Sequence, residues 1–340
     1  MSHYVYVIAR EENRVLVFSM APDSGKLTLL RQAGLDGEPY TACFSPAQDS
    51  LYVTINVEGQ HLVACFSVDQ RTGALTPIGK LAVQAQPAYL SVDHTGRFLL
   101  AAYYVGAMVT VHARNADGTI RERVVDQHKT ERYAHFIKTD PSNRYAFAPH
   151  VVSANAIYQF LFDQETGKLT PNAMPKVDAS PGQGPRHLAF HPTLDIVYAD
   201  NEQECSVTVY RFDRSNGTLA ALQSVSTLPD EGYDGEKSNA QLHLHPQCRA
   251  VYASNRGPDS IAMFSIDPTS GLITSLGQQP SIKVPRAFGI DSGGNYLYNG
   301  GDASPLLVTY RIDQRGVLQP TNDTYEIGTS TTWILPVTFS

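Results

Sequence analysis

Charge is scarce in this 340-residue chain. Asp, Glu, Lys and Arg make up 17% of it, and the formal net charge of -7 comes without a basic cluster. That balance argues against a nucleic-acid partner. No stretch approaches the roughly 18 consecutive apolar residues of a membrane span, so we expect no membrane partner. The first residues show no basic region followed by an apolar core and a cleavage site, which predicts a cytoplasmic protein.

Cysteine is also rare. The four cysteines are Cys43, Cys65, Cys205 and Cys248. None shares the CxxC spacing of a metal or redox site, so we expect reduced, buried thiols. The GxSxG motif of a serine nucleophile is missing too. Ser180 lies in Ala179–Gly182, outside that motif and outside a strand-to-helix turn, so a serine hydrolase is not expected.

Short alternating apolar runs, separated by Gly, Asp, Asn and Pro, fill the chain from end to end. They recur in one frame: a polar entry, an apolar run, a turn, and a second run that ends near Tyr. The residues at that turn are Pro46, His94, Pro141, Pro192, Pro246 and Ser292. A period of roughly 46–54 residues, with four short strands per copy, indicates a β-propeller.

Six copies of the repeat are whole, and a seventh is divided between the chain ends. Residues 331–340 look like a first strand, whereas the N-terminus begins with a second strand at Tyr4–Ala9. Pairing of these two strands would leave no open sheet edge, which favours a closed ring over an open β-solenoid. The sequence therefore predicts an all-β, seven-bladed β-propeller, closed by its C-terminal strand, as a single domain over residues 1–340.

Two positions in each copy are expected to face one channel mouth, because strand one begins at the face where antiparallel strand two ends. Six residues before the turn, the entry positions are Tyr40, Ala88, His135, Arg186, Ala240, Arg286 and Thr332. Ten residues after it, the exit positions are Asn56, Tyr104, Val151, Glu202, Arg256, Asp302 and Arg10. Ala occupies two of the entry positions, so the repeat itself needs no charge there. We therefore expect His135, Arg186 and Arg286 to take part in binding or catalysis. A slip of one residue in any copy would change the set.

The charged members of these positions suit the attack of water on an ester. Either His135 or Glu202 could take a proton from water. Arg186, Arg256 and Arg286 would bind an anionic substrate and stabilise an oxyanion, because Arg keeps its charge and presents a planar fork. Proton transfer next to a carboxylate is the alternative chemistry for the same groups.

Four histidines raise the question of a metal. His191 and His245 precede proline in blade turns, where polar caps are ordinary. His187 and His243 lie in two inner strands and are better placed to line the site. We therefore predict no metal and no cofactor. The predicted substrate-binding residues are Arg286, His187, His243, Tyr104 and Asn56.

The acidic segment Pro229–Glu236 lies in the longest interval between copies and departs from calcium-loop spacing. It leads into a strand-one entry, so we expect it on the same face as the charged residues. A lid or rim over the site and a tolerated surface insertion are both open.

Several segments resemble the seven-bladed propeller lactonase family, which includes bacterial propeller-type 6-phosphogluconolactonases and a fungal carboxymuconate lactonizing enzyme. The matching segments are Gly182–Pro192, Asn201–Glu202, Ser206–Tyr210, Leu242–Pro246, Val251–Arg256 and Pro285–Asp291. The resemblance covers essentially the whole chain. It implies metal-independent hydrolysis or formation of a lactone, with catalytic groups falling on His135, Glu202, Arg186 and Arg256.

We therefore predict a lactonase that hydrolyses a sugar-acid lactone, either 6-phosphogluconolactone or a related aldono- or uronolactone. Its expected partner is a small anionic or polyhydroxy lactone, and a monomer or homodimer is expected. One alternative is a lactonizing cycloisomerase acting on a muconate-like diacid with the same groups. The alternative from another class is a non-catalytic interaction propeller.

Overall fold

The computed structural model describes residues 1–339, which form 28 β-strands in seven four-stranded sheets. Among these residues no helix is present, and hence none that could cross a membrane. The predicted all-β class is confirmed. The chain falls into two compact units. Unit 1 holds residues 1–34, 187–211 and 221–340, and unit 2 holds residues 35–186 and 212–220.

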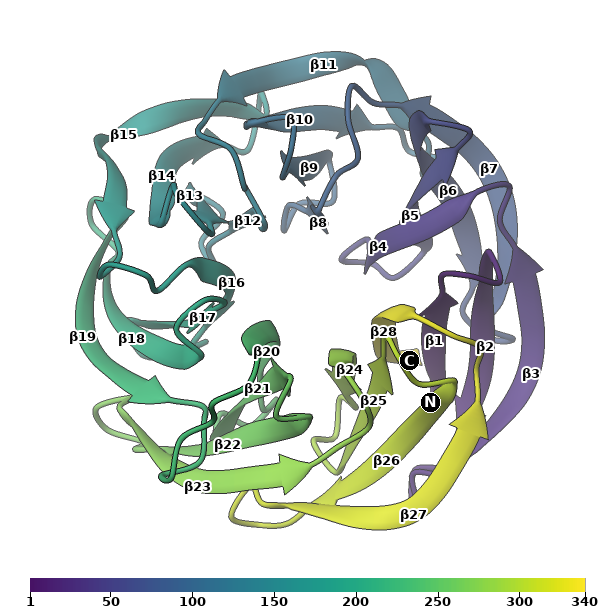
Figure 1. Cartoon of the computed structure of the whole chain (residues 1–340). Helices are drawn as coiled ribbons and strands as arrows, with labels where there is room; N and C mark the ends of the chain where they lie inside the picture. The colour runs from purple at the N-terminus through teal and green to yellow at the C-terminus, as the bar shows by residue number, and fades with distance from the viewer. Residues whose placement is uncertain (340) are drawn as a thin grey trace. The chain divides into compact units, whose positions relative to one another are not determined.

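Unit 1 contains three whole sheets, and in Figure 1 their strands β20, β24 and β28 lie side by side. In hydrogen-bonded order, the first sheet is β28 (Thr331–Phe339), β1 (Ser2–Ala9), β2 (Arg14–Met20) and β3 (Leu27–Gly34). The second is β20 (Ser238–Leu244), β21 (Ala250–Arg256), β22 (Ser260–Ile266) and β23 (Ile273–Pro280). The third is β24 (Pro285–Ile290), β25 (Tyr296–Gly301), β26 (Leu306–Ile312) and β27 (Leu318–Glu326).

Unit 2 also contains three whole sheets, with β4, β8 and β12 adjacent in that order. The first is β4 (Glu38–Phe44), β5 (Ser50–Val57), β6 (Gln60–Asp69) and β7 (Ala74–Ala82). The second is β8 (Tyr89–Val92), β9 (Phe98–Tyr103), β10 (Met108–Arg114) and β11 (Ile120–Lys129). The third is β12 (Lys138–Thr139), β13 (Tyr145–His150), β14 (Ala156–Asp163) and β15 (Lys168–Asp178).

The residues of the seventh sheet are divided between the two units. Its strands are β16 (Pro185–Phe190), β17 (Ile196–Asn201), β18 (Ser206–Asp213) and β19 (Thr218–Ser226).

The C-terminal strand pairs with the N-terminal one, as the divided repeat predicts. β28 runs antiparallel to β1, from Phe339 opposite Ser2 to Thr331 opposite Ala9. It supplies the first strand that the N-terminal copy lacks, so β1 has a hydrogen-bonded neighbour on both sides. Ser340, the last residue of the predicted strand, lies outside the described residues.

Each predicted turn residue lies between the first and second strands of its sheet. In several copies the preceding Asp caps this turn. Asp140 Oδ1, for example, accepts hydrogen bonds from the N–H groups of Arg144 and Tyr145 at 2.9 and 2.8 Å. Histidine replaces it in two copies, where His191 Nδ1 accepts from the Leu194 N–H and His245 Nδ1 accepts from the Gln247 N–H. The prediction that these two histidines serve turns is confirmed.

A Tyr at the third position of the second strand ties one sheet to the next within a unit. Its buried hydroxyl donates to a glycine carbonyl in the turn between the third and fourth strands of the neighbouring sheet. The four donor–acceptor pairs are Tyr52–Gly118, Tyr198–Gly271, Tyr252–Gly316 and Tyr298–Gly25, at 2.8–2.9 Å. A buried polar group needs such a partner, and the glycine carbonyl supplies it.

Candidate active site

Glu202 and Arg256, two of the predicted catalytic residues, form an ion pair in unit 1. Glu202 follows β17, and Arg256 is the last residue of β21. The Arg256 Nη2 donates to Glu202 Oε1 at 2.6 Å and to the Asn239 carbonyl at 2.7 Å. The side chains are only 18% and 16% exposed, so water screens this pair less than a surface pair. The two contacts hold the guanidinium in one orientation.

Arg286 forms a second pair of the same kind. Its Nη1 donates to Asp302 Oδ2 at 3.0 Å, and the other oxygen of Asp302 accepts from the Ser330 hydroxyl at 3.0 Å. Both side chains are mostly buried. An entry-position arginine and the exit-position carboxylate of the same sheet are therefore in contact, which holds Arg286 in one orientation.

A recurrent β-bulge shapes the entry positions. In β20 and β21, Ser238 lies opposite Arg256, and the register shifts between Asn239 and Leu242, so that the entry residue Ala240 falls within the bulge. Shifts at Pro39/Ala42 and Pro285/Ala287 enclose Tyr40 and Arg286 in the same way. The exit residue Arg256 thus pairs with the residue two before the entry. Bulges leave a residue unpaired and re-aim its side chain, which frees the entry residue from the regular ladder.

His187 and His243 both pack against aromatic rings. His187 is buried, its N–H donates to Asp200 Oδ1 at 2.7 Å, and its ring lies 6.1 Å from that of Trp333. The His243 ring lies edge-on to Phe288, with centroids 4.6 Å apart. Within residues 1–339 no group of three or more His, Cys, Asp or Glu could hold a metal ion. Their contact with substrate stays a prediction.

In unit 2, His135 lies in an irregular segment rather than in a full first strand, because β12 begins only at Lys138. It is buried, and its N–H donates to the Pro149 carbonyl at 3.0 Å. The Tyr104 ring stands edge-on to the imidazole, with centroids 5.8 Å apart. Tyr104 in turn packs on Tyr133 and accepts its N–H at 2.7 Å. His135 and Tyr104, predicted from separate copies, are therefore neighbours.

Arg186 is only 2% exposed, at the second position of β16. The preceding loop is anchored by Asn155, whose Nδ2 donates to the Ser180 carbonyl at 2.9 Å and whose Oδ1 accepts from the Gly184 N–H at 2.7 Å. Gly184 has a φ of 70°, which glycine adopts without strain. The hydrogen bonds of Asn155 thus hold the loop that leads into Arg186 in place.

Asn56, predicted to bind substrate, serves a turn. Its Oδ1 accepts from the Gly59 N–H at 2.9 Å, closing the hairpin between β5 and β6. That bond satisfies one acceptor and accounts for an Asn at this position. A contact of Asn56 with substrate stays a prediction.

Cys205 lies beside Glu202 and is poorly suited to act as a nucleophile. The Cys205 thiol is buried near the Glu202 carbonyl, and burial raises its pKa to about 11. The thiol therefore stays protonated at neutral pH and is a poor nucleophile. All four cysteines are free; Cys65 and Cys205 are buried as predicted, whereas Cys43 and Cys248 are only half-buried.

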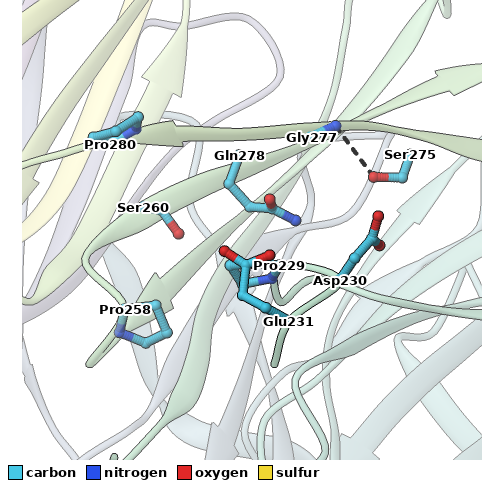
Figure 2. Close-up of a pocket in the computed structure, with 9 residues that line it drawn as sticks. All are labelled: Pro229, Asp230, Glu231, Pro258, Ser260, Ser275, Gly277, Gln278 and Pro280. Atoms are coloured by element: carbon cyan, nitrogen blue, oxygen red, sulfur yellow. Dashed lines mark hydrogen bonds between the residues drawn. The ribbon is translucent and has the colours of Figure 1, made fainter. Parts of the chain in front are cut away.

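The acidic segment borders a cavity of about 510 Å³ in unit 1 (Figure 2). Pro229, Asp230 and Glu231 form part of its wall, together with residues of β22 and β23. Gln278 anchors the start of the segment, because its Nε2 donates to the Leu228 carbonyl at 3.0 Å. The segment is the wall of a cavity, and its role as a lid stays a prediction.

Sequence reasoning missed two residues behind the Glu202–Arg256 pair. Asn239 and Thr227 are fully buried and hydrogen-bonded to each other. The signal for Asn239 is its place immediately before an entry position. Thr227 has no such signal, because it lies in a connection outside the repeated strands.

Known proteins resemble this chain over nearly its whole length. A family model described as "Lactonase, 7-bladed beta-propeller" matches residues 2–336. The 6-phosphogluconolactonases of Pectobacterium carotovorum and Klebsiella pneumoniae are 32% and 30% identical to it, over 98% of this chain and 98% and 99% of theirs. A solved periplasmic gluconolactonase of Pseudomonas aeruginosa is 26% identical, with a TM-score of 0.90 and 99% coverage of both chains. This chain therefore belongs to the seven-bladed β-propeller lactonase family, as its sequence predicts.

Proposed function

We propose that this lactonase hydrolyses an anionic or polyhydroxy sugar-acid lactone, with 6-phosphogluconolactone as the first candidate. Two curated relatives bear the name of an enzyme for that substrate. A relative named for gluconolactone extends the candidates to unphosphorylated aldonolactones. Because that relative is described as periplasmic, the cytoplasmic location of this chain is still only a prediction.

In the proposed reaction, water adds to the lactone carbonyl and a side chain takes the proton. Glu202 or His135 serves as that base, and Arg256 and Arg186 stabilise the negative charge that develops on the carbonyl oxygen. The bond between the carbonyl carbon and the ring oxygen then breaks. The ring oxygen takes up a proton and becomes a hydroxyl, and the product is the open sugar acid. His135 and Arg186 enter this scheme through the repeat pattern and the family resemblance.

The observation that carries the proposal is the Glu202–Arg256 pair. It holds a carboxylate and a guanidinium in a partly desolvated setting, with the guanidinium fixed by a second contact to the Asn239 carbonyl. A preorganised cation is worth more to a developing oxyanion than a mobile one, because it does not have to reorient during the reaction. Arg286, held by Asp302, is the proposed ligand for the substrate's anionic group.

A screen of sugar lactones tests the proposal. The purified protein is offered phosphorylated and unphosphorylated lactones, with and without a chelator, and acid release is followed with a pH indicator. We expect the same turnover with and without the chelator. Arg186→Ala should lose this activity while keeping the far-UV circular-dichroism spectrum of the wild type. Unchanged hydrolysis by Arg186→Ala would contradict the proposed site. Reaction with unsaturated diacids in place of lactones would instead favour the cycloisomerase.

A further inference from the structure

We propose that Thr227 and Asn239 form a positioning unit for the Glu202–Arg256 pair, an inference that rests on the proposed function. Neither side chain is placed in contact with substrate. Both act through the residues that they hold, and the readouts below are chosen for that role.

The main chain of Asn239 touches both members of the pair. Its N–H donates to the Glu202 carbonyl at 3.0 Å, and its own carbonyl accepts from Arg256 Nη2 at 2.7 Å. Asn239 lies where the register between β20 and β21 shifts, so these two groups are turned away from the regular ladder. A displacement of this one residue would therefore move Glu202 and Arg256 relative to each other.

Thr227 holds Asn239 in place. Its hydroxyl donates to Asn239 Oδ1 at 3.1 Å, and its N–H donates to the Cys205 carbonyl at 2.9 Å. Its carbonyl accepts from the Nδ2 of Asn255, the residue before Arg256, at 2.8 Å. Thr227 thus connects the segment that follows Glu202, the bulge at Asn239 and the end of the strand that carries Arg256.

The Thr227 carbonyl also links the positioning unit to the cavity of Figure 2. Gln278, which lines that cavity, donates from Nε2 to the Thr227 carbonyl at 3.2 Å and to the Leu228 carbonyl at 3.0 Å. The acidic segment begins at the next residue, Pro229. The positioning unit therefore lies between the cavity wall and the ion pair.

Removal of the Thr227 hydroxyl group should disrupt the positioning unit. Thr227→Val keeps the shape of the side chain and all main-chain bonds, but it removes the donor to the buried Asn239 Oδ1. A buried acceptor without a donor is unfavourable, so Asn239 is expected to shift. Catalytic groups displaced by about 1 Å can lose on the order of 100-fold in rate.

The test compares Thr227→Val with Thr227→Ser, which restores the hydroxyl, and with Thr309→Val. Thr309 is a buried threonine of unit 1 whose hydroxyl has no hydrogen-bond partner among residues 1–339. We expect Thr227→Val to lower kcat by roughly 10- to 100-fold with little change in KM. Thr227→Ser should recover most of the rate, and Thr309→Val should match the wild type. If Thr227→Val fails to fold, Thr227→Cys, a weaker donor of similar size, should show the same selective loss of kcat.

Two further comparisons separate the possible failures. The wild type reports on the proposed function: if it turns over no lactone in the screen, that function is wrong. Glu202→Gln reports on the catalytic role of the Glu202–Arg256 pair, and normal lactone hydrolysis by this variant would overturn that role. If Glu202→Gln is inactive but Thr227→Val has normal kcat, only the positioning unit is overturned. The positioning unit is also overturned if Thr227→Val and Thr227→Ser lose the same fraction of kcat. A third contrary outcome is a double variant, Thr227→Val with Arg256→Lys, whose loss of rate is the product of the two single losses. Residues that act through Arg256 should instead show non-additive effects with Arg256→Lys.

Discussion

Glu202 and Arg256 are 54 residues apart in the chain, and Arg256 Nη2 donates to Glu202 Oε1 at 2.6 Å. Each occupies the same position in its own repeat, just after or at the end of a second strand. Their contact arises because β17 and β20, the strand that pairs with β21, are neighbours in unit 1, so that equivalent positions of successive repeats lie close together. The carboxylate that follows β17 and the guanidinium at the end of β21 therefore form an ion pair.

Arg256→Lys should lower kcat/KM for lactone hydrolysis by roughly 100-fold or more. Lysine keeps the positive charge, but it lacks the planar fork that serves Glu202 and the Asn239 carbonyl together. Initial rates with a pH indicator measure the effect. The control is Arg311→Lys, at an exposed position of β26, which should behave as the wild type. Equal rates for Arg256→Lys and wild type would mean that charge alone suffices.

Tyr252→Phe should lower the free energy of unfolding by about 1–3 kcal/mol. The change removes a buried hydroxyl and leaves the Gly316 carbonyl without its donor at 2.9 Å. Tyr252→Leu, which also loses ring packing, should be clearly worse. Urea unfolding at neutral pH compares the three proteins. A midpoint for Tyr252→Phe equal to that of the wild type would show that water replaces the tether.

The protein should lose stability as the pH falls below about 6.5, in part because of His112. Burial lowers the pKa of His112 from 6.5 to about 4, so the folded state holds the neutral ring while the unfolded state accepts a proton. The contribution is fully present above pH 6.5 and is lost as the pH falls towards 4. Unfolding in urea from pH 7 to 5 should show a shallower pH dependence for His112→Gln. Identical slopes for the two proteins would contradict this.

Gly217→Ala should destabilise the protein more than Gly277→Ala. Gly217 has a φ of 73°, and a Cβ there would collide with the Tyr145 ring. Gly277 has a φ of 89° but no atom within 4 Å of its Cβ position, so it reports the backbone strain alone. That strain is about 1–2 kcal/mol. Thermal unfolding of both variants measures the difference, and equal melting temperatures would show that the Tyr145 ring moves aside freely.

Much of the fold was predictable because its causes are local. Alternation of apolar residues predicts strands, and Pro, Asp or His at the turn predicts where the first strand gives way to the second, as at Pro141 and Pro192. The missing first strand at the N-terminus predicted the pairing of β28 with β1. The same counting selected Glu202 and Arg256. It could not foresee the bulge at Asn239, because a bulge depends on how two strands pair and leaves no period in the sequence.

The sequence by itself determined the number of repeats, the strand and turn frame, the closing strand and the family. These follow from patterns that each copy carries within its own residues. Only the tertiary structure decided that Asn56 closes a turn, that Asp302 holds Arg286, and that Thr227 and Asn239 stand behind the Glu202–Arg256 pair. The reason is physical: a hydrogen bond between distant segments depends on register and packing to within a few tenths of an ångström, and composition and spacing do not specify a position that closely.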